Sequence, residues 1–117
     1  MPPAERDRLS NMLEAARDAA SFATDRTRSD LDHDRMLRHA LFNCIQIIGE
    51  ASSHVSPATR MQLDTIPWRQ IRGMRNFLVH AYHGVNLDAL WRTVTTDIPV
   101  LIEALAAYLG TDAELGI

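Results

Sequence analysis

The sequence contains no lysine, a single cysteine and no glycine-rich segment among its five glycines. Without a glycine-rich loop the chain lacks the usual cradle for nucleotide phosphates, so a nucleotide-binding helical domain ranks last among the interpretations of the sequence. The cysteine, Cys44, lies in the apolar run of residues 41–45, where we expect a buried thiol rather than a nucleophile or a metal ligand. All twelve basic residues are arginine; compositional bias is the simpler explanation, although arginine also binds phosphate with the better geometry.

Targeting and membrane segments are also missing from the pattern. Residues 1–6, MPPAER, are polar and lack the apolar stretch of a signal peptide. No segment approaches the roughly 18 apolar residues that a membrane-spanning helix needs. We therefore expect a cytoplasmic protein without a membrane partner.

Length, composition and charge indicate an ordinary folded protein. The 117 residues, 46% hydrophobic and 23% charged, predict a single domain over residues 1–117. The net charge of −3 argues against a protein that coats nucleic acid by bulk attraction. The charge is unevenly spread, however: residues 56–92 carry five arginines against two acids, whereas residues 93–117 carry four acids and no arginine. Positive charge is thus concentrated in the middle of the chain.

Apolar residues recur at helical spacing along most of the chain, and no segment alternates as a strand does. The pattern predicts helices over residues 4–23, 31–55, 57–63, 67–82 and 86–110. The second is the best core candidate, with a stripe of Met36, Leu37, Ala40, Leu41, Cys44, Ile45 and Ile48. Four main helices with short connections, plus one short helix, predict an all-α, antiparallel four-helix bundle.

Helix ends are signalled by particular residues. Ser29 or Asp30 is a candidate N-cap for the second helix, Ser56 before Pro57 for the short helix, and Asn86 for the last. Glycine ends helices readily, which predicts stops at Gly84 and Gly110. Pro99 removes one backbone hydrogen bond from the last helix, so we expect an interruption near Thr95.

The residues most informative about function lie between positions 72 and 84 of the sequence, RGMRNFLVHAYHG. Helical spacing places Arg75 on or beside the apolar face, where a guanidinium needs an anionic partner. Two interpretations remain open at this stage. Arg75 pairs with a carboxylate of the same chain, for which Glu50 is the best candidate, or it faces a phosphate-binding cleft shared between subunits.

His80 is equally ambiguous when its position alone is considered. An isolated histidine near a helix end more often caps the helix or lies on the surface than acts as a catalyst. His80 and His83 are the only two of the five histidines at a helical spacing that suggests a metal pair, but no third ligand lies nearby. We therefore expect no metal site and no cofactor.

The sequence reproduces the motif of the HEPN superfamily, which here consists of Arg75, four further residues, His80, one further residue and Tyr82. The flanking segments 66–69 and 84–87, with residues 47–51 and 97–101, are similar to the HepT branch of that superfamily. The resemblance covers about residues 8–109. A bare spacing of arginine and histidine is weak, whereas the motif within these flanks is specific.

The resemblance implies a homodimer whose two motifs meet at the interface and cleave RNA, transfer RNA among the candidate substrates, without a metal. Arg75 and His80 would be the catalytic residues. It also implies the toxin of a type VII-like toxin–antitoxin pair, silenced when an MNT-type nucleotidyltransferase antitoxin attaches AMP to Tyr82. From the residues alone, Tyr82 is a core aromatic with a hydrogen-bonded hydroxyl.

Three further residues are candidates for supporting roles. Asn76 lies one turn before His80 and either orients its ring or contacts RNA, or is a surface amide. Arg69 and Arg72 extend a phosphate-binding surface or are simply solvated. The rival interpretation is a non-catalytic helical dimer that only binds a nucleotidyltransferase. Phe77 and His83 depart from the commoner family pattern and leave substrate preference and partner fit open.

Overall fold

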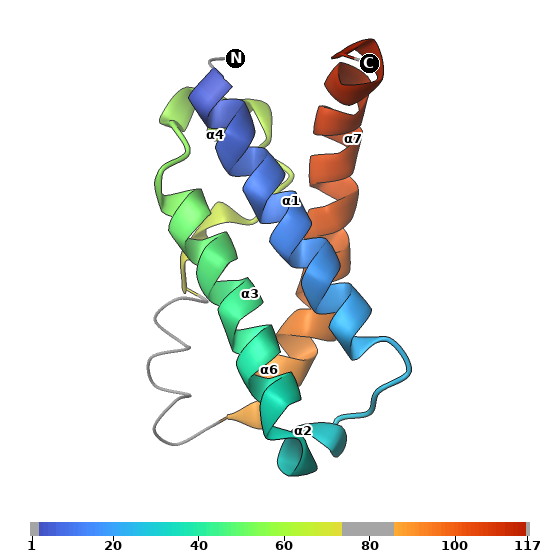
Figure 1. The fold of residues 1–117 in the computed structure, drawn as a ribbon. Helices are drawn as coiled ribbons and strands as arrows, with labels where there is room; N and C mark the ends of the chain where they lie inside the picture. The colour runs from blue at the N-terminus through green and yellow to red at the C-terminus, as the bar shows by residue number, and fades with distance from the viewer. Residues whose placement is uncertain (1–2, 74–85, 117) are drawn as a thin grey trace.

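The computed structural model describes residues 3–73 and 86–116, with side-chain surroundings for residues 4–73 and 86–110. Three long helices dominate: α1 (Pro3–Ala23), α3 (Arg35–Ser53) and α7 (Ile98–Gly116). Helix α1 lies between the other two and runs antiparallel to both (Figure 1). The described residues are helical with no strand, which confirms the all-helical class. The dimer remains a prediction.

The core lies where α1 faces α3 and α7. Leucine, methionine and alanine recur along one side of α1, so that side contacts both neighbours. The buried residues form a single cluster whose largest fully enclosed side chains are Leu9, Met12, Leu31, Leu41, Ile45, Ile48, Ile71, Leu90, Val94, Ile98, Leu101 and Leu105. This cluster fixes the three long helices relative to one another.

The predicted helix over residues 31–55 is in fact two helices, α2 (Asp30–His33) and α3. The break falls at Asp34, whose extended backbone (φ −116°, ψ 95°) ends α2 and whose side chain accepts a hydrogen bond from the Leu37 N–H at 3.0 Å. Asp34 is therefore the N-cap of α3. Ser29 precedes α2 but makes no side-chain cap bond, while Asp30 accepts from the Thr27 N–H.

The break also explains a wrong assignment in the core stripe. Met36, predicted to be buried, is 80% exposed in the first turn of α3. Leu37 is buried instead and begins the stripe that continues through Leu41, Cys44, Ile45 and Ile48. A helical position one residue away points about 100° around the axis, and at the start of α3 this turns Met36 away from the side on which Leu37 meets the core.

Two short helical segments follow α3. Helix α4 (Pro57–Gln62) begins as predicted, because the Ser56 hydroxyl accepts a hydrogen bond from the Thr59 N–H at 3.3 Å. Residues 68–73 are also helical. The predicted helix over residues 67–82 and its stop at Gly84 otherwise lie outside the described residues.

The last helix departs from ideal α geometry where the sequence predicted an interruption. After α6 (Leu87–Arg92), capped by Asn86, the chain forms one π-helical turn, η1 (Thr93–Asp97), before α7. Pro99 has no N–H for the Thr95 carbonyl, which favours this local rearrangement. The predicted stop at Gly110 is wrong: the helix continues to Gly116, and Gly110 does not adopt a left-handed conformation.

The segment Leu87–Gly110 is long and apolar enough to cross a membrane by length and composition alone. The expectation that no segment approaches that limit was therefore wrong. In the fold, Leu90, Val94, Ile98, Leu101 and Leu105 of this segment are buried in the protein core. A core helix passes the same composition test, so this segment has a structural role within the bundle.

Candidate functional site

The central residues of the predicted site lie outside the described part of the chain. Arg75, Asn76, His80 and Tyr82 all fall within residues 74–85. The same holds for the pairing of Arg75 with Glu50 and for the interface cleft. The structure instead defines the two segments that lead into and out of this sequence.

The segment before the motif is anchored in the core. Ile71 is 1% exposed and belongs to the central cluster. The indole Nε1–H of Trp68 donates a hydrogen bond to the Leu63 carbonyl at 3.0 Å, and the Ile71 N–H donates to the Pro67 carbonyl at 3.1 Å. The helix at 68–73 therefore approaches the motif from a fixed position.

The segment after the motif is held by a cap and an ion pair. The Asn86 side chain accepts a hydrogen bond from the Ala89 N–H at 3.0 Å and so starts α6. In the first turn of α6, Asp88 accepts a hydrogen bond from the Arg28 Nε–H at 2.5 Å, across 60 residues of sequence. Hydrogen bonding to Asp88 raises the pKa of Arg28 above its ordinary value. Asp88 thus connects the start of α6 with the connection between α1 and α2.

Arg69 and Arg72 are both exposed on the helix at 68–73. Neither has a carboxylate partner among the residues that the structure describes. Unpaired guanidinium groups beside the motif sequence suit phosphate contacts, and they suit a solvated helix surface equally well. Their role remains a proposal.

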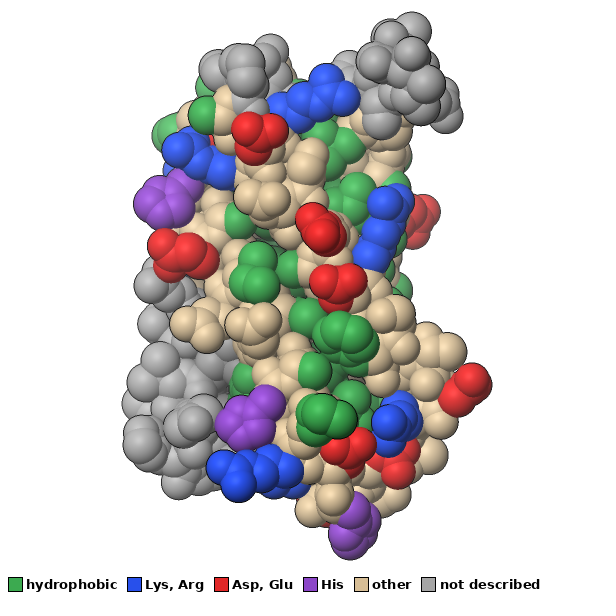
Figure 2. Space-filling model, in the orientation of Figure 1, with side chains coloured by type: hydrophobic (Ala, Val, Ile, Leu, Met, Phe, Trp, Pro, Cys, Tyr) green, Lys and Arg blue, Asp and Glu red, His purple; other side chains and the backbone are tan. Residues whose placement is uncertain are grey.

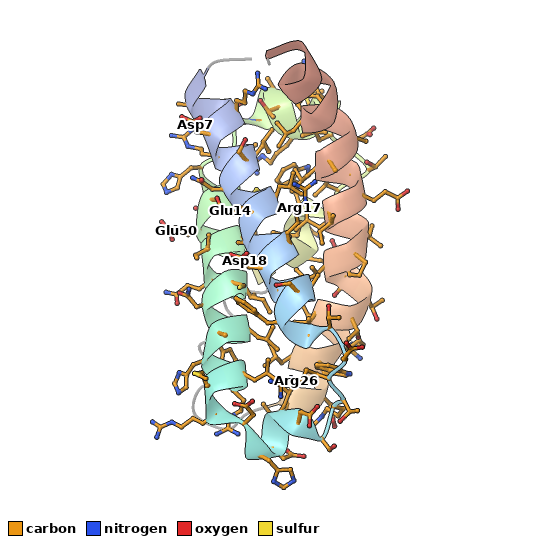
Figure 3. The ribbon with its side chains drawn as sticks, turned by 45° about the vertical axis from the view of Figure 1, so that its right-hand side comes forward. Asp7, Glu14, Arg17, Asp18, Arg26 and Glu50 are labelled. Atoms are coloured by element: carbon orange, nitrogen blue, oxygen red, sulfur yellow. The ribbon has the colours of Figure 1, made fainter. Side chains whose placement is uncertain are left out.

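The sequence did not reveal a groove of about 710 Å³ between α1 and α3. Its lining includes the acids Glu14, Asp18 and Glu50, which lie along adjoining faces of the two helices (Figure 3). The space-filling view shows several acidic side chains on this face of the molecule (Figure 2). Glu50 also contacts the His54 Nε2 at 3.2 Å. The spacing of Glu14 and Asp18 on one helix face signals half of this groove, but the pairing of the helices cannot be read from sequence. Its negative charge makes it unsuited to an RNA backbone.

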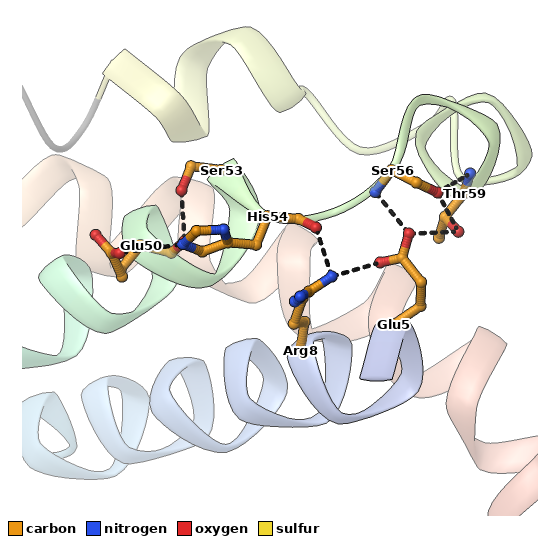
Figure 4. Close-up of polar contacts among 7 residues, drawn as sticks. All are labelled: Glu5, Arg8, Glu50, Ser53, His54, Ser56 and Thr59. Carbon is orange, nitrogen blue, oxygen red and sulfur yellow. Dashed lines mark hydrogen bonds and ion pairs between the residues drawn. The ribbon is translucent and has the colours of Figure 1, made fainter. Parts of the chain in front are cut away.

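A polar network ties the start of α1 to the turn between α3 and α4 (Figure 4). The Glu5 carboxylate accepts a hydrogen bond from the Ser56 N–H at 2.6 Å and lies 3.7 Å from the Arg8 guanidinium. Arg8 donates to the His54 carbonyl at 2.8 Å. Hydrogen bonding to Ser56 lowers the pKa of Glu5, although burial opposes this. The network is structural and helps to position α4.

Other candidate chemistry is limited in the described ranges 4–73 and 86–110. No three histidine, cysteine, aspartate or glutamate side chains gather there in a way that holds a metal ion. Cys44 is 4% exposed, as predicted, and burial raises the pKa of its thiol to about 11. A protonated, enclosed thiol is a poor nucleophile.

Comparison with known proteins gives consistent matches. The family model described as "Ribonuclease HepT-like" matches residues 12–108. The chain is 34% identical over 91 residues to "Putative RNase MJ1380" of Methanocaldococcus jannaschii, covering 78% of this chain and 84% of that protein. It is 35% identical over 101 residues to "Probable ribonuclease HepT" of Thermococcus cleftensis, covering 86% and 92%. No solved structure gives a significant match.

Proposed function

This chain belongs to the HepT-like ribonuclease family, and on that premise we propose that it is a metal-independent endoribonuclease, the toxin of a type VII-like toxin–antitoxin pair. The observation that carries the proposal is the motif of Arg75, His80 and Tyr82, which lies intact within the matched residues 12–108. Relatives that match along most of their length are named as ribonucleases.

The proposed reaction needs two copies of the chain. A twofold axis that brings the two motifs together places two His80 imidazoles and two Arg75 guanidinium groups around one phosphodiester. One imidazole takes the proton of the 2′-hydroxyl, and that oxygen attacks phosphorus. The bond to the 5′-oxygen breaks, and the second imidazole, in its protonated form, gives that oxygen a proton. The products are a 2′,3′-cyclic phosphate and a 5′-hydroxyl.

Charge stabilisation falls to arginine in this scheme. Negative charge builds on the non-bridging phosphate oxygens in the transition state, and the guanidinium of Arg75 provides two donors with matching geometry. Imidazole titrates near neutral pH, so His80 is suited to act as both base and acid. Asn76 orients the imidazole of His80, and Arg69 and Arg72 bind phosphates further along the RNA.

Silencing by an MNT-type nucleotidyltransferase antitoxin follows the same electrostatic argument. AMP attached to the Tyr82 hydroxyl adds bulk and a negative phosphodiester next to Arg75 and His80 in the motif. That phosphate competes with RNA for the same guanidinium groups. The modified toxin therefore loses substrate binding.

The decisive experiment compares purified wild type with Arg75→Ala and His80→Ala in EDTA, using transfer and messenger RNA and analysing product ends. Cleavage to cyclic phosphate ends by the wild type alone supports the proposal. Gln70→Ala, an exposed position just upstream, is the matched control and should retain full activity. An inactive wild type, or equal cleavage by all four proteins, would favour a non-catalytic dimer that binds a nucleotidyltransferase.

A further inference from the structure

A small hollow lies on the side of α4 that faces the helix at 68–73. It is lined by Pro57, Arg60, Met61, Asp64 and Trp68 and has a volume of about 430 Å³. The first three residues share one face of α4, because they are spaced three and four apart. This α4–Trp68 hollow shares no lining residue with the acidic groove between α1 and α3.

The hollow exposes apolar surface beside an ordered aromatic ring. Met61 is 78% exposed and adds apolar surface to the lining of the hollow. The ring of Trp68 is half-buried, and its hydrogen bond to the Leu63 carbonyl holds one edge. A ring fixed in this way offers a stacking surface at little entropic cost.

Positive charge borders this apolar surface. The half-buried Arg60 lines the hollow, and the exposed Arg72 lies one helical turn beyond Trp68. Neither guanidinium has a carboxylate partner among the described side chains. Asp64 is the only acid in the lining. A basic surface that also presents an aromatic ring has the features with which proteins bind single-stranded nucleic acid.

We propose that the α4–Trp68 hollow binds single-stranded RNA, with Arg60 and Arg72 on successive phosphates and a base stacked on Trp68. This proposal rests on the proposed ribonuclease function and adds a substrate-positioning surface to it. The adjoining motif begins three residues beyond Arg72.

Binding is best measured with a 2′-O-methyl RNA oligonucleotide, which cannot be cleaved because it has no free 2′-hydroxyl. Arg60→Gln should weaken binding several-fold and reduce the slope of log affinity against log salt by about 0.7, the value for one phosphate contact on a single strand. Arg17→Gln is the matched control. It removes the same charge from an exposed site on α1. At 1.5 Å per residue, this site lies roughly 18 Å along the helix from Glu5, the residue of α1 that contacts Ser56 at the start of α4.

Stacking is tested by two substitutions at the same position. Trp68→Leu should weaken binding at least fivefold or so, whereas Trp68→Phe keeps an aromatic face and most of the affinity. Both lose the hydrogen bond to Leu63, so a purely structural role would affect the two variants alike. In a Trp91→Phe background, Trp68 is the only indole, and bound RNA should quench its fluorescence.

The outcomes separate this proposal from the ribonuclease proposal. One outcome is that the wild type binds RNA without cleaving it, while Arg60→Gln and Trp68→Leu bind it more weakly. That result supports the hollow and contradicts the nuclease. A second outcome is that the wild type cleaves RNA, while Arg60→Gln, Trp68→Leu and Arg17→Gln all bind RNA with the same affinity. That result supports the nuclease and overturns the hollow. A wild type that does not bind the oligonucleotide also overturns it, and the surface would then suit a protein partner.

Discussion

The Glu5 carboxylate accepts a hydrogen bond from the Ser56 backbone N–H across 51 residues of sequence, at 2.6 Å. This contact joins the first turn of α1 to the residue that caps α4. It therefore connects the N-terminal helix with one side of the proposed RNA-binding hollow. Glu5 is only 5% exposed, so its charge depends on these partners.

Glu5→Gln should lower the free energy of unfolding by about 1–2 kcal/mol at neutral pH, because a charge-assisted hydrogen bond to a buried group is weakened. The folded-state pKa of Glu5 lies below its ordinary value of 4.5, so its contribution is present above pH 4.5 and is lost as pH falls through the folded-state pKa. Urea denaturation of both proteins at neutral pH and at about pH 3 measures the difference. Glu14→Gln, exposed on the same helix, should show little effect; an unchanged difference at low pH would contradict the argument.

Leu41→Ala should destabilise the fold by about 2–5 kcal/mol, since Leu41 is fully enclosed and its loss leaves a cavity. Met36→Ala on the same helix should change stability by no more than about 0.5 kcal/mol, because Met36 is largely in solvent. Thermal unfolding of the two variants beside the wild type tests both. Comparable losses would mean that Met36 is covered in solution, for example by a second copy.

Asn86→Ala should cost about 1 kcal/mol, because the Ala89 N–H loses its side-chain acceptor at the start of α6. A loss of that size lowers the Tm of a chain of this length by about 4 °C. Asn86→Ser keeps an oxygen acceptor and should recover most of the difference. If Asn86→Ser melts with Asn86→Ala, the cap does not contribute as described.

Cys44 should resist alkylation in the folded protein. With a thiol pKa of about 11, only about one molecule in 10,000 carries the thiolate at pH 7, and the side chain is enclosed. Iodoacetamide labelling followed by mass spectrometry should give almost no adduct in buffer and complete modification in urea. Rapid labelling without denaturant would show that this part of α3 opens readily.

Tyr82→Phe should retain RNA cleavage and escape modification by the nucleotidyltransferase, since phenylalanine has no hydroxyl to receive AMP. Incubation with labelled ATP and the antitoxin, followed by mass spectrometry, measures this. Tyr108→Phe is the control, because Tyr108 is the other of the two tyrosines in the sequence and its hydroxyl donates a hydrogen bond to Gln62. AMP on the Tyr82→Phe chain at the wild-type rate would contradict the assignment.

Local sequence signals predicted the helices better than their junctions. Apolar spacing and the capping residues Ser56 and Asn86 gave the correct starts of α4 and α6. The break at Asp34 was missed because the residue is flanked by neither glycine nor proline, and a side-chain cap competes with helix continuation there. At Gly110 the error was of the opposite kind, because a helix end was predicted where α7 continues. Glycine within a helix has only a modest energetic cost, which is too small to end α7 there.

The functional residues divide in a similar way. The motif containing Arg75 and His80 is a sequence pattern and was recognised directly, together with the family that it indicates. The α4–Trp68 hollow and the α1–α3 groove depend on which helices meet, and residues such as Arg60 and Trp68 have no local signal that pairs them. Contacts between distant segments, like that of Glu5 with Ser56, are set by packing and are accessible only in three dimensions.

The π-helical turn at Thr93–Asp97 has a consequence for the length of the chain. A π turn accommodates one residue more than an α turn does, so it acts as a tolerated single-residue insertion. Giving this turn α geometry with the same number of residues would rotate everything downstream by about 100° relative to Leu90. Ile98, Leu101 and Leu105 would then leave the core together. The turn thereby sets the phase between the two halves of the C-terminal helix.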